Sequence, residues 1–191
     1  MIETPHGPAR AHLHEAEEPR GLLILGHGAG GGVTARDLVK ARDVALGEGF
    51  NVALVEQPYR VAGRKSPASA PQLDAAWIAV VEHLRGDLPI VCGGRSSGAR
   101  VACRTAAETG AVGVLCLAFP LHPSGRPEKT RLPELEAVSV PVLIVQGESD
   151  PFGMPPAGPD RTVVKIKGNH SLASDMGTLG GAVGEWLRLR V

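Results

Sequence analysis

The chain has 191 residues, with 20 basic and 20 acidic side chains, so its formal net charge is zero, and only 3% of it is aromatic. This length fits one domain with a single substantial core. The balanced charge argues against a surface for nucleic acid or anionic membranes, and the few aromatic side chains argue against stacking on bases.

The N-terminal residues and the cysteines bear on where the protein works. Met1–Gly7 lacks the basic-then-apolar pattern of a secretion signal, and no apolar run reaches the ~20 residues of a membrane span. Cys92, Cys103 and Cys116 lie in or beside apolar runs, and their odd number predicts reduced core residues. We therefore expect a cytoplasmic protein that binds neither nucleic acid nor membranes.

Seven short strands are predicted along the chain. The first mixes small and apolar residues with Arg10, His12 and His14, which is typical of an exposed edge strand, expected to be antiparallel. The others are short apolar runs typical of buried strands. In chain order, the predicted strands are Ala9–Ala16, Leu22–Leu25, Asn51–Val55, Pro89–Cys92, Val112–Phe119, Pro141–Val145 and Thr162–Ile166.

Amphipathic helices are predicted over residues 34–47, 73–84 and 172–187, and a helix-like run of small and basic residues is predicted over residues 99–104. We expect the first to begin at Thr34, with Asp37 as its capping-box partner. Gly180 and Gly181 weaken the last helix locally. The alternation predicts a single α/β domain over residues 1–191, with a mostly parallel sheet of about seven strands and helices on both faces. Sites in such sheets lie beyond the carboxyl ends of the strands.

The stretch Pro89–Arg104 carries the first chemical motif. It begins as an apolar strand, turns sharply through Gly93–Gly98 and continues as a helix-like run. The turn contains G-x-S-x-G, which places Ser96 on a strained elbow between a strand and a helix. A five-residue match is weak by itself, because any Gly/Ser turn between a strand and a helix has a similar composition.

Two further residues at strand ends complete a pattern. Asp150 and His170 each follow a predicted strand, so that serine, acid and histidine occur in that order. A serine hydroxyl needs a base to remove its proton, and histidine changes its charge state near neutrality. A buried carboxylate can hold the imidazole in the useful tautomer. Glu148 and the strand-end Glu56 remain alternatives for the acid.

The glycine-rich loop after Leu25 supplies the fourth part. An acyl-transfer intermediate carries an oxyanion that backbone N–H groups must stabilise, and we expect these to come from Ala29 and Ser97. The loop lacks the Lys-Ser/Thr pair of a P-loop, no dinucleotide fingerprint occurs, and no metal ligands cluster in the sequence. The sequence therefore predicts no metal and no cofactor.

Other polar residues are candidates for the rim of the site. His122 follows a strand end and, with Arg64, is a candidate for lining the pocket. Arg60, Arg64, Arg95 and Arg100 are of a type that is usually solvated or ion-paired, and each is also a candidate contact for an anionic substrate.

Together these segments resemble a known family. The resemblance is carried by HGAG (His27–Gly30), GGRSSGAR (Gly93–Arg100), QGESDPFG (Gln146–Gly153), GNH (Gly168–His170), YRVAGR (Tyr59–Arg64) and FPLHPSGRPEK (Phe119–Lys129). From about Leu22 to the last helix, the chain resembles the α/β-hydrolase fold, and most of all a lid-less subgroup of small members related to dienelactone hydrolase.

The resemblance implies that Ser96 is the nucleophile, Asp150 the acid and His170 the base. Dienelactone hydrolase itself has a cysteine nucleophile, so the serine here favours ordinary esterase chemistry over that particular substrate. We expect a serine hydrolase that cleaves a small ester or thioester through an acyl-enzyme. The alternatives are a hydrolase-like scaffold that binds a ligand or protein partner with little turnover, and a peptidase.

The predicted loop Leu121–Glu134 bears on substrate size. It is rich in proline and charge and has no apolar stripe, so it should form no lid helix. We expect it to run as an extended loop along the rim of a shallow site that prefers short acyl groups.

Overall fold

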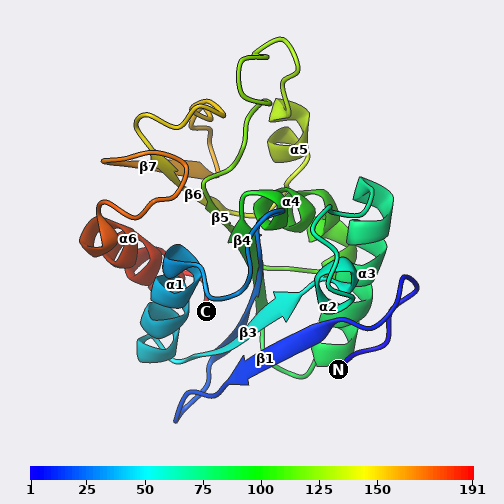
Figure 1. Cartoon of the computed structure of the whole chain (residues 1–191). Helices are drawn as coiled ribbons and strands as arrows, with labels where there is room; N and C mark the ends of the chain where they lie inside the picture. The colour runs from blue at the N-terminus through cyan, green and yellow to red at the C-terminus, as the bar shows by residue number, and fades with distance from the viewer.

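A seven-stranded sheet forms the centre of the computed structural model, which describes residues 1–191. Its strands are β1 (Arg10–His14), β2 (Gly21–Gly26), β3 (Phe50–Glu56), β4 (Ile90–Arg95), β5 (Gly113–Leu117), β6 (Val142–Gly147) and β7 (Arg161–Ile166). They are ordered β1-β3-β2-β4-β5-β6-β7, and every pairing is parallel except that of β1 with β3 (Figure 1). The prediction of a mostly parallel sheet with an antiparallel first strand is confirmed.

Five helices lie between the strands, namely α1 (Arg36–Gly47), α2 (Pro58–Val61), α3 (Ala70–Leu84), α4 (Ser97–Thr109) and α5 (Leu132–Glu136), and α6 (Met176–Arg188) follows the last strand. α1 and α6 pack together on one face of the sheet, and α3 and α4 pack together on the other (Figure 1). None of the helices is long and apolar enough to cross a membrane.

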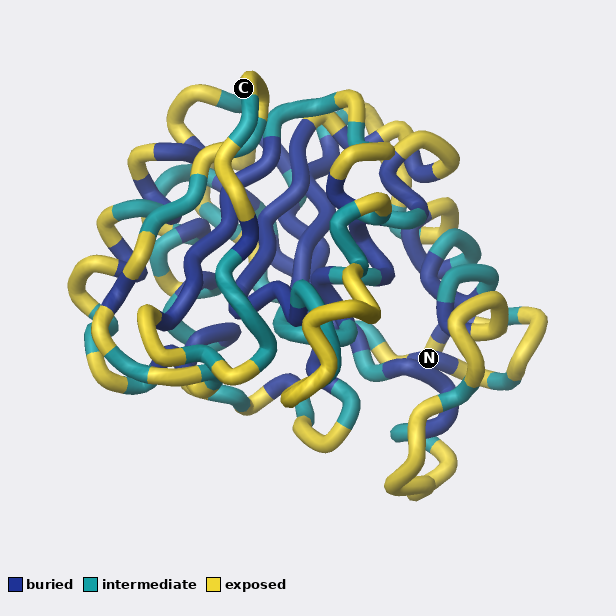
Figure 2. Tube along the Cα trace, turned by 90° about the horizontal axis from the view of Figure 1, so that it is seen from above, coloured by how far each residue is buried: buried dark blue, intermediate teal, exposed yellow.

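The core lies on both faces of the sheet because side chains alternate along each strand. In β2, Leu23 and Leu25 pack into the cluster under α1 and α6, whereas Ile24 packs into the cluster under α3 and α4. Figure 2 shows the central strands as the most continuously buried part of the chain. All three cysteines are buried and unpaired, as predicted.

The start of α1 differs from the prediction. Ala35 is the N-cap residue, no side chain caps the helix, and Thr34 is exposed. Asp37 does not complete a capping box, because its carboxylate turns inward to the Leu38 amide and the Arg95 guanidinium. The predicted Thr34–Asp37 capping box is therefore wrong, and a buried ion pair takes its place.

The last helix begins later than predicted, at Met176, where the Asp175 side chain accepts a hydrogen bond from the Thr178 amide. Two of its glycines lie close to α1, since a Cβ at Gly180 would be 2.6 Å from Cε of Lys40 and one at Gly184 would be 3.2 Å from Cγ1 of Val44, whereas a Cβ at Gly181 would meet open space. The short helix α5 was not predicted, because five residues are too few for a helical apolar pattern.

Candidate active site

The elbow around Ser96 is tighter than predicted. β4 continues through Gly93 and Gly94 as far as Arg95, and α4 begins at Ser97, so Ser96 alone makes the turn, with φ of 53°. A Cβ at Gly94 would lie 2.5 Å from the carbonyl oxygen of Gly26 in β2. The glycines that suggested a longer turn are thus needed for close strand packing. A positive φ is uncommon at serine, and such strain is concentrated at functional sites.

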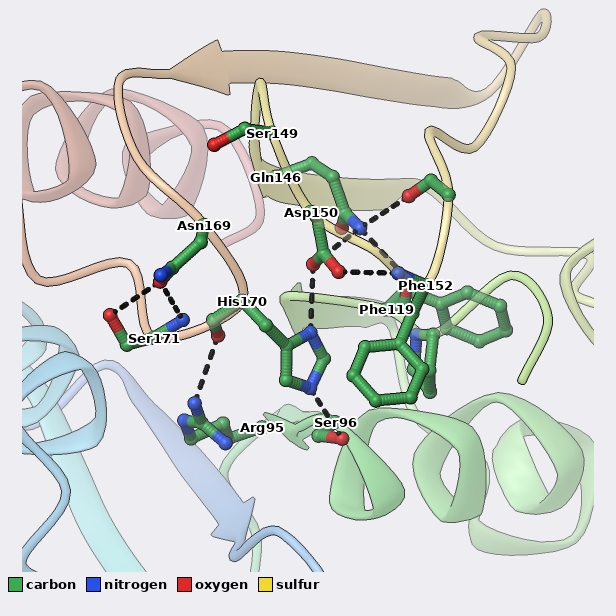
Figure 3. Close-up of polar contacts among 12 residues, drawn as sticks. Arg95, Ser96, Phe119, Gln146, Ser149, Asp150, Phe152, Asn169, His170 and Ser171 are labelled. Carbon is green, nitrogen blue, oxygen red and sulfur yellow. Dashed lines mark hydrogen bonds and ion pairs between the residues drawn. The ribbon is translucent and has the colours of Figure 1, made fainter. Parts of the chain in front are cut away.

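Ser96, His170 and Asp150 lie in one chain of hydrogen bonds (Figure 3). His170 Nε2 is 2.9 Å from Ser96 Oγ, and His170 Nδ1 is 2.7 Å from Asp150 Oδ2. An ionised carboxylate can only accept, so Nδ1 carries the proton and Nε2 is free to accept from the serine hydroxyl. The Asp150 side chain is only 1% exposed and that of His170 is 18% exposed. The structure therefore brings together the three residues that the sequence singled out.

Gln146, at the end of β6, holds the carboxylate of Asp150. Its buried Nε2 donates to Asp150 Oδ2 at 3.0 Å and also contacts the carbonyl oxygens of Phe119 and Gly153. The Phe152 amide donates to Asp150 Oδ1 at 2.9 Å. Both carboxylate oxygens are thus fixed independently of His170. Gln146 was not among the predicted site residues, because in the sequence it resembles one more residue of a buried strand.

The glycine loop after β2 is fixed by two side chains. The backbone N–H of Gln57 donates to His27 Nε2, so His27 Nδ1 carries the proton and donates to the Gly28 carbonyl oxygen at 2.8 Å. Burial lowers the pKa of His27, which favours this neutral ring. The Tyr59 hydroxyl donates to the Ala29 carbonyl oxygen at 3.0 Å. The loop is therefore held by hydrogen bonds on consecutive carbonyl groups.

The two predicted oxyanion donors stand where amides lack protein partners. The Ala29 N–H makes no hydrogen bond, and a planar trans peptide directs it away from the pinned Gly28 carbonyl. Ser97 is the first residue of α4, where a helix provides no internal acceptor for the amide. Both amides are thus unpaired within the protein, and that of Ser97 lies at the positive end of the helix dipole of α4.

A hollow of about 560 Å³ lies in front of Ser96 and His170. Its walls are the glycine loop, the first turn of α1 and the loop that follows His170. Phe152 borders it and packs against the His170 ring, with 4.4 Å between the ring centroids. Its only other hydrophobic lining residues are alanines, namely Ala29, Ala35 and Ala173. Apart from Phe152, the hollow is therefore lined by small residues and polar side chains, and no large aliphatic side chain borders it.

Of the other candidates from the sequence, Arg95 lines this hollow, whereas the remaining ones lie outside its lining. His122 packs beside Gly153 and is not part of the lining, and Arg64 borders a separate hollow of about 100 Å³. Glu56 pairs with side chains of β1, and Glu148 is exposed without a hydrogen bond to His170. Of the three carboxylates considered, only Asp150 contacts the histidine. No group of three His, Cys, Asp or Glu side chains could hold a metal ion.

Solved structures with the same fold include a lidless serine hydrolase from Xanthomonas campestris, with a TM-score of 0.79 and 19% identity over 98% of this chain and 91% of that one. Est1E from Butyrivibrio proteoclasticus with ferulic acid bound has a TM-score of 0.75 and 18% identity over 95% of each chain. Dienelactone hydrolase from Anabaena variabilis has a TM-score of 0.76 and 16% identity over 97% of this chain and 94% of that one.

These TM-scores establish a shared fold. No curated protein matches the chain in sequence. A family model described as an alpha/beta hydrolase domain matches residues 19–172, which is well over half of the chain. The chain belongs to the alpha/beta hydrolase domain family.

Proposed function

We propose that the protein is a serine hydrolase that cleaves small esters or thioesters through an acyl-enzyme. The observation that carries this proposal is the position of His170, whose two ring nitrogens contact Ser96 Oγ and Asp150 Oδ2. Nucleophile and base within hydrogen-bond reach, with a third group orienting the base, are the signature of an activated serine.

In the proposed first half-reaction, Ser96 Oγ attacks the carbonyl carbon while its proton passes to His170 Nε2. Asp150 stays ionised and stabilises the imidazolium through the Nδ1–H hydrogen bond. The Ala29 and Ser97 amides stabilise the negative charge on the former carbonyl oxygen. His170 then gives its proton to the departing alkoxide or thiolate, which leaves an acyl group on Ser96.

In the second half-reaction, water takes the place of the leaving group. His170 removes a proton from the water as it attacks the acyl carbon, and returns a proton to Ser96 Oγ when the ester bond breaks. The open hollow in front of Ser96 supports such access of water. The shared fold of Est1E with ferulic acid bound is consistent with a small carboxylic ester as substrate.

The test compares hydrolysis of p-nitrophenyl acetate by the wild type and by Ser96→Ala. We expect kcat/KM to fall by at least about 10³-fold, because the nucleophile is lost. The matched control is Ser149→Ala, which removes an exposed hydroxyl that donates to the Gly168 carbonyl, away from the His170 ring. The control should stay within about twofold of wild type, as is usual for surface substitutions. Full activity in Ser96→Ala would refute the proposal.

A further inference from the structure

Arg95, the last residue of β4, connects three segments of the candidate site. Its Nη2 donates to the backbone carbonyl oxygen of His170 at 2.9 Å (Figure 3). Its Nε lies 2.9 Å from Asp37 Oδ2 at the start of α1. A Cβ at Gly28 would lie 3.1 Å from its Nη1, so the guanidinium also packs against the glycine loop. One side chain beside the nucleophile thus contacts both the histidine loop and the glycine loop.

Asp37 holds this guanidinium in place. Its side chain is only 1% exposed, and its other oxygen accepts a hydrogen bond from the Leu38 amide. The contact between Oδ2 and Arg95 Nε is short but not aligned as a hydrogen bond, so it acts chiefly as an ion pair. A buried carboxylate is costly unless it is paired, which makes the arrangement of the two side chains mutually dependent.

The ion pair of Arg95 and Asp37 also affects the charge near His170. In the proposed reaction His170 becomes a cation, and an unpaired guanidinium bonded to the same loop would oppose that change. Asp37 supplies a compensating negative charge next to Arg95. An arginine suits this place because its planar fork donates in two directions from fixed atoms, whereas a lysine has a single donor atom.

We propose that Arg95 is a positioning residue that sets the backbone of His170 relative to Ser96, with Asp37 as the residue that holds Arg95. This inference rests on the proposed hydrolase function. It assigns roles to two side chains that act through His170 and take no part in the bond-making steps. It also explains why Asp37 lies inside the protein instead of capping α1.

The test measures kcat and KM for p-nitrophenyl acetate and the rate constant for phosphonylation of Ser96 by a fluorophosphonate. The variants are Arg95→Gln, Arg95→Lys and Asp37→Asn. We expect Arg95→Gln to lower kcat and the phosphonylation rate by ~10- to 100-fold, because a shift of about 1 Å in a catalytic group can cost that much. KM should change by less than about threefold, since Arg95 need not bind substrate. Arg95→Lys should recover part of the lost rate.

The matched control is Arg100→Gln. Arg100 lies one turn after Ser96 and pairs with Glu134 in two hydrogen bonds, and its side chain is 25% exposed against 19% for Arg95. It has no hydrogen bond to His170, so its loss should affect stability but leave kcat within about twofold. Urea unfolding of each variant separates a loss of stability from a loss of positioning.

The possible results separate the two proposals. An active wild type with Arg95→Gln unchanged in kcat would overturn the role of Arg95 and leave the hydrolase proposal standing. That role would also be overturned if Arg100→Gln lowered kcat equally, or if only KM rose. A wild type without turnover or labelling would overturn both. If Arg95→Gln does not fold, the Arg95→Lys and Asp37→Asn variants provide the test. A kcat unchanged in both would refute the positioning role of Arg95.

Discussion

The Asp150 carboxylate is buried, so the free-energy cost of burying its charge depends on the hydrogen-bond donors around it. Besides His170, Gln146 provides a side-chain donor, and its Nε2 contacts the carboxylate and the carbonyl groups of Phe119 and Gly153. The chain of hydrogen bonds from Ser96 to Asp150 therefore depends on Gln146, a residue that takes no part in the bond-making steps. Such residues hold the reacting groups within the narrow range of geometry that catalysis requires.

Replacement of Gln146 by methionine tests this role. Gln146→Met keeps a long unbranched side chain but leaves buried acceptors without a partner, which should cost about 1–3 kcal/mol of unfolding free energy. It should also lower kcat, because Asp150 loses a fixed contact. The matched variant is Gln57→Met, since Gln57 is also buried but its Nε2 donates only to the Leu73 carbonyl. Equal losses of stability in urea unfolding, with kcat unchanged in both, would contradict the role of Gln146.

For individual residues, the sequence predicts those that react but not those that hold them in position. Ser96, Asp150 and His170 could be found because reactive residue types follow strands at the expected places. Arg95, Gln146 and Tyr59 contact backbone carbonyl groups that are distant in the sequence, and no local pattern encodes those contacts. Thr34 and Asp37 matched a capping box by spacing alone, but the guanidinium of Arg95 competed for the carboxylate.

Among the elements, the connection from β5 to β6 decides how open the site is. It contains a proline-rich loop and the short helix α5, and Figure 1 shows this loop projecting away from the sheet. The loop is attached beside the site through Arg131, which bonds the carbonyl groups of Pro120 and Leu121, and through Arg100 and Glu134. The connection therefore forms no helical cover over Ser96.

A site without a cover should gain little from long acyl chains. A fully buried methylene contributes ~0.8 kcal/mol, which corresponds to roughly a fourfold gain in kcat/KM. The hollow has few apolar lining residues, so we expect less than about a twofold change per methylene from acetyl to octanoyl p-nitrophenyl esters. The reaction rate should show no jump when the ester exceeds its micellar concentration. A steady rise through eight carbons would reveal an apolar channel and disprove this role of the loop.

The strands and the longer helices were predictable because apolar runs and helical periodicity mark them directly. The failures were local. Gly93 and Gly94 suggested a turn but extend β4, because glycine is needed where β4 meets its neighbours and α4. Leu172 was assigned to the last helix for its apolar character, yet it is a buried loop residue with φ of 52°. The residue type alone does not distinguish a glycine in a turn from one in a strand, or a leucine in a helix from one in a buried loop.

For the whole molecule, the topology explains how distant residues form one site. β4, β6 and β7 end at the same edge of the sheet, so Ser96 and His170 meet although they are 74 positions apart. The parallel sheet also directs the start of α4 toward the same edge. A sequence pattern can predict this convergence once the strands are assigned, since the carboxyl ends of parallel strands must meet there.

Ser96 is proposed to be an activated nucleophile, and covalent labelling measures the reactivity of its hydroxyl most directly. The wild-type protein is treated with a fluorophosphonate, digested and analysed by mass spectrometry, beside Ser96→Ala and His170→Gln. We predict one phosphonyl group per chain on Ser96 in the wild type, none in Ser96→Ala, and labelling slowed by several orders of magnitude in His170→Gln. An unlabelled wild type, or a label that persists in Ser96→Ala, would contradict the claim and favour a hydrolase-like scaffold without turnover.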